Sequence, residues 1–215
     1  MLIVGAKGFA KEVLEILHQQ NRLQHLVFYD DINQDIQSEL FGKFPILKSL
    51  EAAAHYFATI DNHFTIGIGN PSLRKSLSDK FTSIGGIYSS TISNSARLGS
   101  YDVSIGDGSN ILDGAILSNS AKIGVGCIVY YNVIITHDCF VDDFVEISPS
   151  AILLGRCKVG SFTQIGANAT ILPDIIVGSN VIIGAGSVVT KDIPDNSLVV
   201  GVPATVKKLL PPIKF

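Results

Sequence analysis

The strongest pattern in the sequence is an aliphatic residue at every sixth position through the C-terminal half of the chain. A period of six is neither the period of an α-helix nor the alternation of a single strand. It fits a chain that runs straight, turns and runs straight again, with one aliphatic side chain per straight stretch in a shared interior. Three such stretches close one coil, so the pattern predicts an all-β parallel β-helix over residues 85–205. The aliphatic positions are Ile105, Ile111, Leu117, Ile123, Val129, Ile135, Val141, Ile147, Leu153, Val159, Ile165, Ile171, Val177, Ile183 and Val189.

A second column of the repeat, four residues after each aliphatic, holds mostly small residues and no charge. A narrow prism needs small inward side chains beside the large ones, so this column is also predicted to face inward. All three cysteines lie in it, which indicates packing, and an odd number of buried thiols fits a reducing cytoplasm. The column consists of Ser109, Ala115, Ala121, Cys127, Val133, Cys139, Val145, Ala151, Cys157, Thr163, Ala169, Ile175, Val181, Ser187 and Ile193.

Residues 1–84 do not follow the period of six and are predicted to form a separate α/β domain. The pattern indicates strands at residues 1–4, 26–29 and 64–68, and helices from Phe9 and over 47–56 and 72–81. Alternating strands and helices predict a small parallel sheet, similar to half of a Rossmann fold. Residues 206–215 are left as a C-terminal tail.

The first strand is followed by the glycine turn Gly5-Ala-Lys-Gly8 and the second by Asp30 and Asp31. A glycine turn that opens a helix presents free N–H groups to a phosphate, and acidic residues at the end of a second strand often hold ribose hydroxyls. The turn lacks the third glycine of the dinucleotide fingerprint, and the domain is small. These features favour a single nucleotide or a nucleotide-linked sugar; the alternative is that the glycines serve only the turn.

His137 is the one histidine of the repeat, and it lies in a turn position. Counting along the coils stacks it on Gly155, whose missing side chain opens a notch and whose N–H could face a ligand. A base beside a backbone donor has the parts needed for acyl transfer. The alternative is that His137 is only a solvated turn residue. Asp138 could support His137 by charge, or could instead form an ion ladder with Arg156.

Composition excludes several other classes of function. The formal net charge is −3 and no basic stripe is present, which argues against nucleic acid as a main partner. The sequence has no apolar run long enough for a membrane span, and its first residues are typical of a strand and turn, not of a signal peptide. One histidine and no CxxC motif in the repeat argue against a metal site. A hydrophobic content of 47% fits a prism that trimerises side by side.

The chain as a whole resembles a known family. The matching stretches are residues 4–10 (VGAKGFA), 29–31 (YDD), 66–70 (IGIGN) with Arg74, 136–139 (THDC) and 200–204 (VGVPA). Together they cover nearly the full chain and resemble the left-handed β-helix acyltransferases, specifically the bacterial nucleotide-sugar N-acetyltransferases and the sialic acid O-acetyltransferases of similar layout.

The resemblance implies a left-handed coil and a cytoplasmic homotrimer with active sites between subunits. It implies that His137 is the general base and that Asp138 supports it. It places the nucleotide sugar at Lys7, Gly8, Phe9, Asp30, Asp31, Gly69 and Asn70, and acetyl-CoA along the coils near Glu146, Gly155, Ala167, Gly184 and Ala185.

The chain departs from the family at two places. Glu146 stands where related enzymes have a second histidine that meets the cofactor, and Lys7 and Phe9 stand where the glycine turn often carries a small residue and a histidine.

From the resemblance as a whole we expect transfer of acetyl from acetyl-CoA to the amino group of a nucleotide-linked amino sugar. The alternatives are O-acetylation of sialic acid or a related sugar, a non-catalytic β-helix scaffold and, more remotely, a metalloprotein on the same prism.

Overall fold

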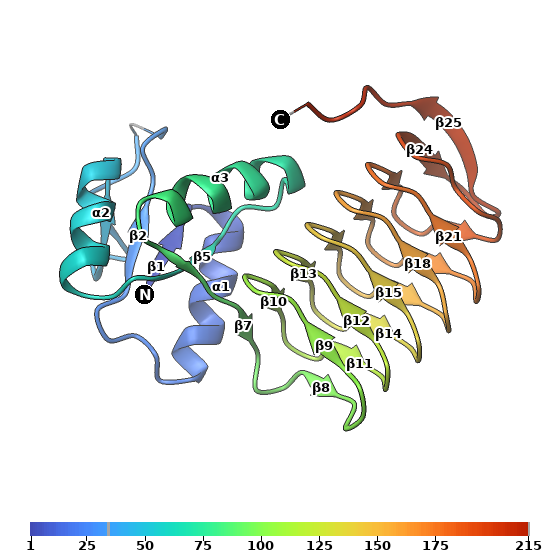
Figure 1. The fold of residues 1–215 in the computed structure, drawn as a ribbon, viewed down its shortest axis with the longest axis horizontal. Helices are drawn as coiled ribbons and strands as arrows, with labels where there is room; N and C mark the ends of the chain where they lie inside the picture. The colour runs from blue at the N-terminus through green and yellow to red at the C-terminus, as the bar shows by residue number, and fades with distance from the viewer. Residues whose placement is uncertain (34, 215) are drawn as a thin grey trace.

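The computed structural model describes residues 1–33 and 35–214 and shows a small α/β domain packed against the first coils of a β-helix (Figure 1). The α/β domain has one sheet, in the order β3-β4-β2-β1-β5-β6, in which only the β3–β4 pair is antiparallel. Its elements are β1 (Leu2–Val4), α1 (Gly8–Gln19), β2 (Val27–Tyr29), β3 (Glu39–Leu40), β4 (Phe44–Leu47), α2 (Leu50–Thr59), β5 (His63–Ile66), α3 (Pro71–Ser83) and β6 (Ile87–Tyr88).

The two faces of this sheet are covered by different helices. Val13, Leu14 and Leu17 of α1 pack on one face, and Phe57 of α2 and Phe81 of α3 pack on the other. The predicted parallel sheet is therefore present, and its last strand, β6, extends to Tyr88. The predicted start of the second helix was wrong: residues 44–47 form strand β4, and α2 begins only after Ser49, whose hydroxyl caps the helix by accepting from the N–H of Ala52.

The remainder of the chain is a left-handed parallel β-helix with three sheets, here named PB1, PB2 and PB3. Register confirms the predicted coil, since Asn110 pairs with Ile128, Ile116 with Ile134 and Lys122 with Phe140. PB1 contains β7 (Thr91–Ile92), β10 (Asn110–Ile111), β13 (Ile128–Val129), β16 (Glu146–Ile147), β19 (Gln164–Ile165), β22 (Ile182–Ile183), β24 (Ser197–Val200) and β25 (Thr205–Leu209). PB2 contains β8 (Arg97–Leu98), β11 (Ile116–Leu117), β14 (Ile134–Ile135), β17 (Ile152–Leu153), β20 (Thr170–Ile171) and β23 (Val188–Val189). PB3 contains β9 (Ser104–Ile105), β12 (Lys122–Ile123), β15 (Phe140–Val141), β18 (Lys158–Val159) and β21 (Ile176–Val177).

Both predicted inward columns form the core of the prism. The large aliphatics from Ile111 to Val189 are buried, and so are the small residues between them, including the three cysteines. All three are free, and the Sγ atoms of Cys139 and Cys157, one coil apart, lie 3.6 Å from each other. The expected C-terminal tail contributes more than a loop, because β25 pairs antiparallel with β24.

From the turn after Ile105 to the turn after Ile183, each turn of the prism has one residue in the left-handed region of φ, three positions after the inward aliphatic. The slot takes Gly108, Gly114, Gly126 and Gly186, but also Asp138 (φ 59°), Phe144 (φ 57°), Arg156 (φ 63°) and Phe162 (φ 62°). Left-handed φ is uncommon for such side chains, so the repeat geometry overrides the local preference at these turns.

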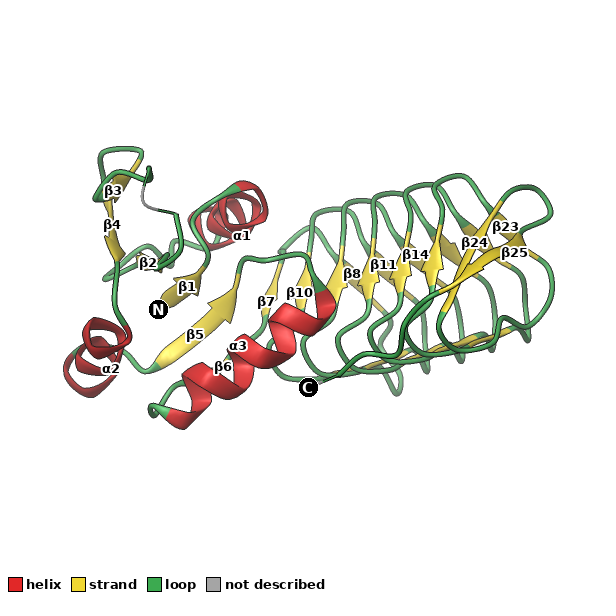
Figure 2. Cartoon of the chain, turned by 90° about the horizontal axis from the view of Figure 1, so that it is seen from above, coloured by secondary structure: helices red, strands yellow, loops and turns green. Residues whose placement is uncertain are grey.

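Arg74 joins the two domains. Its side chain is fully buried, and its guanidinium donates to the carbonyl oxygens of Gly69, Gly126 (3.0 Å), Phe144 (2.8 Å) and Val145 (3.2 Å). Figure 2 shows the N-terminal end of α3, which carries Arg74, reaching the prism at β10. The α/β domain therefore sits on PB1 in a fixed orientation. No helix in the described part of the chain is long and apolar enough to cross a membrane.

Candidate active site

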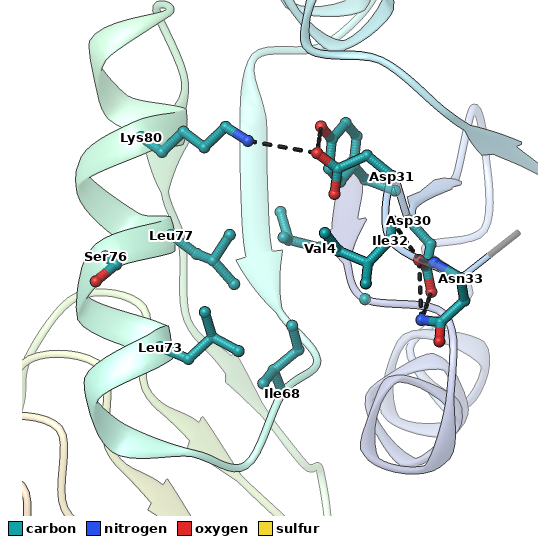
Figure 3. Close-up of a pocket in the computed structure, with 12 residues that line it drawn as sticks. Val4, Asp30, Asp31, Ile32, Asn33, Ile68, Leu73, Ser76, Leu77 and Lys80 are labelled. Carbon is teal, nitrogen blue, oxygen red and sulfur yellow. Dashed lines mark hydrogen bonds and ion pairs between the residues drawn. The ribbon is translucent and has the colours of Figure 1, made fainter.

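A pocket of about 440 Å³ lies in the α/β domain between α3 and the loop after β2 (Figure 3). Its walls are mainly apolar, and Val4 and Ile68 lie between the two sides. Lys80 from α3 reaches across one end to Asp31, with 3.5 Å between Nζ and Oδ2, while Ile68 and Leu73 form the other end. The pocket is thus a slot between two elements that follow the carboxyl ends of parallel strands, where α/β folds bind ligands.

The two acidic residues expected at the ligand site have different environments. Asp30 is buried, and its carboxylate accepts hydrogen bonds from the backbone N–H groups of Ile32 and Asn33 and from the Asn33 amide. Asp30 therefore stabilises the conformation of the loop that follows β2. Asp31 is exposed and accepts from the hydroxyl of Tyr29 at 2.8 Å, so it remains available to a ligand at the slot's polar end.

The other residues expected to bind the nucleotide sugar do not line this slot. Lys7 and Gly8 stand at the N-terminus of α1, where no side chain caps the helix, and Lys7 Nζ contacts Asn33 Oδ1 at 2.5 Å. An uncapped helix start next to the slot suits a phosphate. Phe9 packs against Tyr130 of the prism, with 5.2 Å between ring centroids. Gly69 and Asn70 lie outside the slot lining, and Asn70 caps α3 by accepting from the N–H of Leu73 at 2.9 Å.

His137 and Asp138 lie in the turn between β14 and β15, at the corner of the prism between PB2 and PB3. Nδ1 of His137 is 2.7 Å from Oδ2 of Asp138, and the two side chains are 55% and 54% exposed. In the neutral tautomer that suits this contact, Nδ1–H donates to the carboxylate and Nε2 carries the lone pair. In the described ranges no hydrogen bond is made to Nε2, so this nitrogen is available to accept a proton.

Gly155 lies one coil beyond His137, as the count along the sequence predicts. A Cβ added to Gly155 would lie 2.7 Å from Cε1 and 2.8 Å from Nε2 of His137, so the imidazole occupies the space that the glycine leaves. Within residues 1–33 and 35–214 no acceptor takes the N–H of Gly155. The notch thus combines a base with a free backbone donor, the two groups needed to attack a carbonyl and stabilise its oxyanion.

The alternative role of Asp138, an ion ladder with Arg156, is not formed in the described part of the chain. Arg156 instead pairs with Asp174 through Nε–Oδ1 (2.6 Å) and Nη2–Oδ2 (2.8 Å), and this hydrogen bonding lowers the pKa of Asp174. Arg156 is therefore engaged elsewhere, and Asp138 serves the imidazole.

Glu146 and the small residues expected near the cofactor lie at other places on the prism. Ala167, Gly184 and Ala185 belong to the turns after β19 and β22, at the corner between PB1 and PB2. Glu146 lies on PB1, and a Cβ added to Gly69 would lie 3.6 Å from its Oε2. Neither group is at the corner that carries His137 and Gly155.

Neither the Cys127 thiol nor a metal-binding cluster provides a second reactive site in residues 1–33 and 35–214. Burial raises the pKa of the Cys127 thiol to about 12, which makes it a poor nucleophile. No group of three or more His, Cys, Asp or Glu side chains is placed to hold a metal ion in the part of the chain that the structure describes.

Comparison with known proteins identifies this two-domain arrangement. Residues 1–81 match the PglD N-terminal domain, and residues 156–191 match the bacterial transferase hexapeptide model of six repeats. The chain superimposes on perosamine N-acetyltransferase from Caulobacter crescentus with a TM-score of 0.89 and 27% identity, covering 96% of each chain. The chain therefore carries a PglD N-terminal domain and bacterial transferase hexapeptide repeats, and it is an acyltransferase.

Two further solved structures share the architecture of this acyltransferase. The acetyltransferase domain of PglB from Neisseria gonorrhoeae has a TM-score of 0.88 and 29% identity, over 96% of this chain and 98% of the other. WeeI from Acinetobacter baumannii has a TM-score of 0.87 and 29% identity, with the same coverage. No curated protein sequence matches.

Several residues that shape the site of this acyltransferase escaped the sequence analysis. Lys80, Leu73 and Leu77 line the slot from α3, but in the sequence they look like ordinary surface and core positions of an amphipathic helix. Arg74 was noted only as part of a matching stretch, and its partners are backbone carbonyl oxygens, which no residue type marks.

Proposed function

We propose that this acyltransferase moves the acetyl group of acetyl-CoA to the amino group of a nucleotide-linked amino sugar in the cytoplasm. The support comes from structures of the same architecture: the Caulobacter crescentus protein was solved with CoA and GDP-perosamine, and the PglB domain with acetyl coenzyme A. The slot in the α/β domain, with a helix N-terminus beside it, offers a nucleotide both an apolar cleft and a phosphate site.

The observation that carries this proposal is the geometry of His137. Its Nδ1 is held by Asp138 at 2.7 Å, and its ring lies over Gly155. A histidine fixed through Nδ1 presents Nε2 as a general base, and the free N–H of Gly155 is one coil away.

The reaction follows from these two groups. The neutral amine attacks the thioester carbonyl, and Nε2 of His137 takes a proton from the nitrogen as the C–N bond forms. The N–H of Gly155 donates to the carbonyl oxygen as negative charge develops on it. The C–S bond then breaks, CoA leaves as a thiolate, and the proton on His137 neutralises it. No covalent bond to the enzyme is required.

The proposed site needs a second copy of the chain. His137 lies at the corner between PB2 and PB3, whereas the slot belongs to the domain that packs on PB1, on the opposite side of the prism. A sugar held in the slot therefore approaches the His137 corner of a neighbouring subunit. This supports the homotrimer, in which each active site lies between two protomers.

The outward side of PB2 offers the surface for this assembly. It carries a stripe of aliphatic residues on adjacent strands, and the stripe runs beside the His137 corner. An aliphatic stripe along a sheet is best buried against another copy. Its residues are Ile116, Ile134, Ile152 and Val188, interrupted by Thr170.

The small residues at the corner between PB1 and PB2 suit the cofactor. Ala167 and Ala185 stack on consecutive coils, where the N–H of Gly186 bonds to the Ala167 carbonyl at 2.8 Å. Their short side chains leave the corner smooth, and we place the extended arm of acetyl-CoA there, with its thioester at the Gly155 notch of the adjacent subunit.

A thiol-release assay tests the function. Acetyl-CoA is offered with UDP-, dTDP- and GDP-linked amino sugars and with free sialic acid. We expect turnover on a nucleotide-linked amino sugar and a loss on the order of 10²- to 10⁴-fold in His137→Ala, which retains the fold. Turnover on sialic acid alone would instead identify an O-acetyltransferase, and near-normal turnover by the variant would remove His137 as the base.

A further inference from the structure

Glu146 is a carboxylate placed between the two domains without a hydrogen-bond donor. It extends from β16 on PB1 toward the loop between β5 and α3, and its side chain is half-buried there. Over residues 1–33 and 35–214, no N–H or O–H group donates to its oxygens. A carboxylate withdrawn from water without donors costs free energy, so its retention points to a ligand that supplies them.

The neighbours of Glu146 do not satisfy it. The charge of Arg74 interacts electrostatically with Glu146, but the guanidinium donates its hydrogen bonds to four backbone carbonyl oxygens and none to Glu146. The charge of Glu146 contributes to the raised pKa of Tyr130, but Tyr130 forms no hydrogen bond with Glu146. Gln164, which pairs with Glu146 on the next coil, forms no side-chain hydrogen bond with it either. Burial raises the pKa of Glu146 while Arg74 opposes the rise. A cationic ligand group that donates N–H bonds would supply the hydrogen bonds that the protein does not give this carboxylate.

One end of the slot in the α/β domain is formed by the residue that precedes Gly69, the glycine that faces this carboxylate. Ile68 and Leu73 form the end of the slot away from Lys80 and Asp31 (Figure 3). Gly69 directly follows Ile68, and the nearest atoms to a Cβ added to Gly69 are the carboxylate oxygens of Glu146, at 3.6 and 3.9 Å. A ligand that leaves the slot at this end passes Gly69, and the absence of a side chain there leaves Glu146 within reach.

We propose that Glu146 binds the amino group of the acceptor sugar in its ammonium form and so selects an amine over a hydroxyl acceptor. This inference rests on the proposed function. A carboxylate forms a charge-assisted hydrogen bond with an ammonium group, whereas a sugar hydroxyl or the acetylated product offers it no charge. The ammonium loses one proton to solvent before attack, and the amine gives its next proton to His137. Acetylation removes the charge, which weakens binding and favours product release.

Calorimetric titration in the absence of acetyl-CoA tests this role. The wild-type enzyme is titrated with the nucleotide-linked amino sugar that it turns over and with the N-acetylated product. We expect the amine to bind roughly 10- to 100-fold more tightly than the product, and Glu146→Gln to reduce this ratio to near one. Glu15→Gln removes the same charge from the exposed face of α1 and is expected to leave the ratio unchanged.

Kinetics of the same variants separates the outcomes. Glu146→Gln is expected to raise KM for the amino sugar and leave KM for acetyl-CoA unchanged. An undiminished preference for the amine in Glu146→Gln would overturn the inference, as would a rise confined to KM for acetyl-CoA, which would place Glu146 at the cofactor. Acetylation of hydroxyl acceptors alone by the wild-type enzyme would overturn the proposed function itself.

Discussion

The imidazole of His137 lies over Gly155 of the next coil, so closely that any side chain at position 155 would meet the ring. The repeat creates this contact, because equivalent turn positions of consecutive coils stack directly on each other. One coil thus supplies the imidazole, and the next supplies both the space for it and a free N–H.

Gly155→Ala is expected to displace the imidazole. The added Cβ would lie 2.7 Å from Cε1, and φ at this position is not left-handed, so the backbone accepts alanine. We expect kcat to fall on the order of 10²-fold and the melting temperature to change little, because a small misplacement of a base is costly for rate alone. The double variant with His137→Ala should be no slower than His137→Ala itself; independent losses would show that the two residues do not act together.

Asp138→Asn is expected to preserve the conformation of the turn and to lower kcat. Asparagine tolerates the left-handed φ of 59° at this position, but its amide cannot hold His137 as a carboxylate does. We expect kcat to fall on the order of 10²- to 10⁴-fold in the thiol-release assay. Asp174→Asn is the matched control, since it makes the same change in the same left-handed slot and breaks only the exposed pair with Arg156. Equal losses in both variants would refute the supporting role of Asp138.

The β-helix could be predicted from the sequence because every coil requires the same types of residue at the same positions. Ile111 and Val129 meet identical surroundings, so the constraint accumulates along the chain. The stacking of His137 on Gly155 followed from the same count. The left-handed slot did not, because the positions that take it include Phe144 and Arg156, whose side chains do not favour that conformation.

Other parts of the molecule depend on contacts that no local pattern encodes. Strand β4 was missed because Phe44–Leu47 is short and runs almost directly into α2, where the helical pattern dominates. The pocket lining from α3 arises from the orientation of that helix, which Arg74 fixes through carbonyl oxygens of distant turns. The pairing of Arg156 with Asp174 in place of Asp138 is a choice between two neighbouring coils that spacing leaves open.

Arg74→Met is expected to loosen the junction between the domains. The change removes the donor of four carbonyl oxygens, three of them in buried hydrogen bonds, so we expect the free energy of unfolding to fall by about 3–5 kcal/mol. Urea denaturation measures this loss. Lys75→Met changes the next residue of the same helix, an exposed lysine paired with Asp79, and should have little effect. A similar stability in both variants would mean that the guanidinium does not hold the domains together.

Mixed trimers are expected to restore activity that neither parent shows. One parent is His137→Ala, and the other is Leu73→Trp, which fills the slot of its own α/β domain. When the two subunits are co-expressed, some interfaces join an intact slot to an intact His137, because the proposed site takes each from a different chain. Thiol release by the purified mixture tests this arrangement, and each parent alone is the control. A mixture as inactive as its parents would place the whole site within one protomer.

Glu146→Gln is expected to stabilise the protein in the absence of substrate. Burial raises the pKa of Glu146 above its ordinary value of 4.5, against the opposing charge of Arg74. A carboxyl group with a higher pKa in the folded state favours folding while protonated, and this contribution is lost as the pH rises from 4.5 through the folded pKa. At pH 7 the variant should therefore melt a few degrees above the wild type, with the difference shrinking below pH 4.5. Glu15→Gln should show no such difference, and a Glu146→Gln protein that melts lower at pH 7 would mean that the Arg74 charge outweighs burial. A gain in stability together with weaker binding of the amine would show that the chain keeps this carboxylate for its ligand and not for its fold.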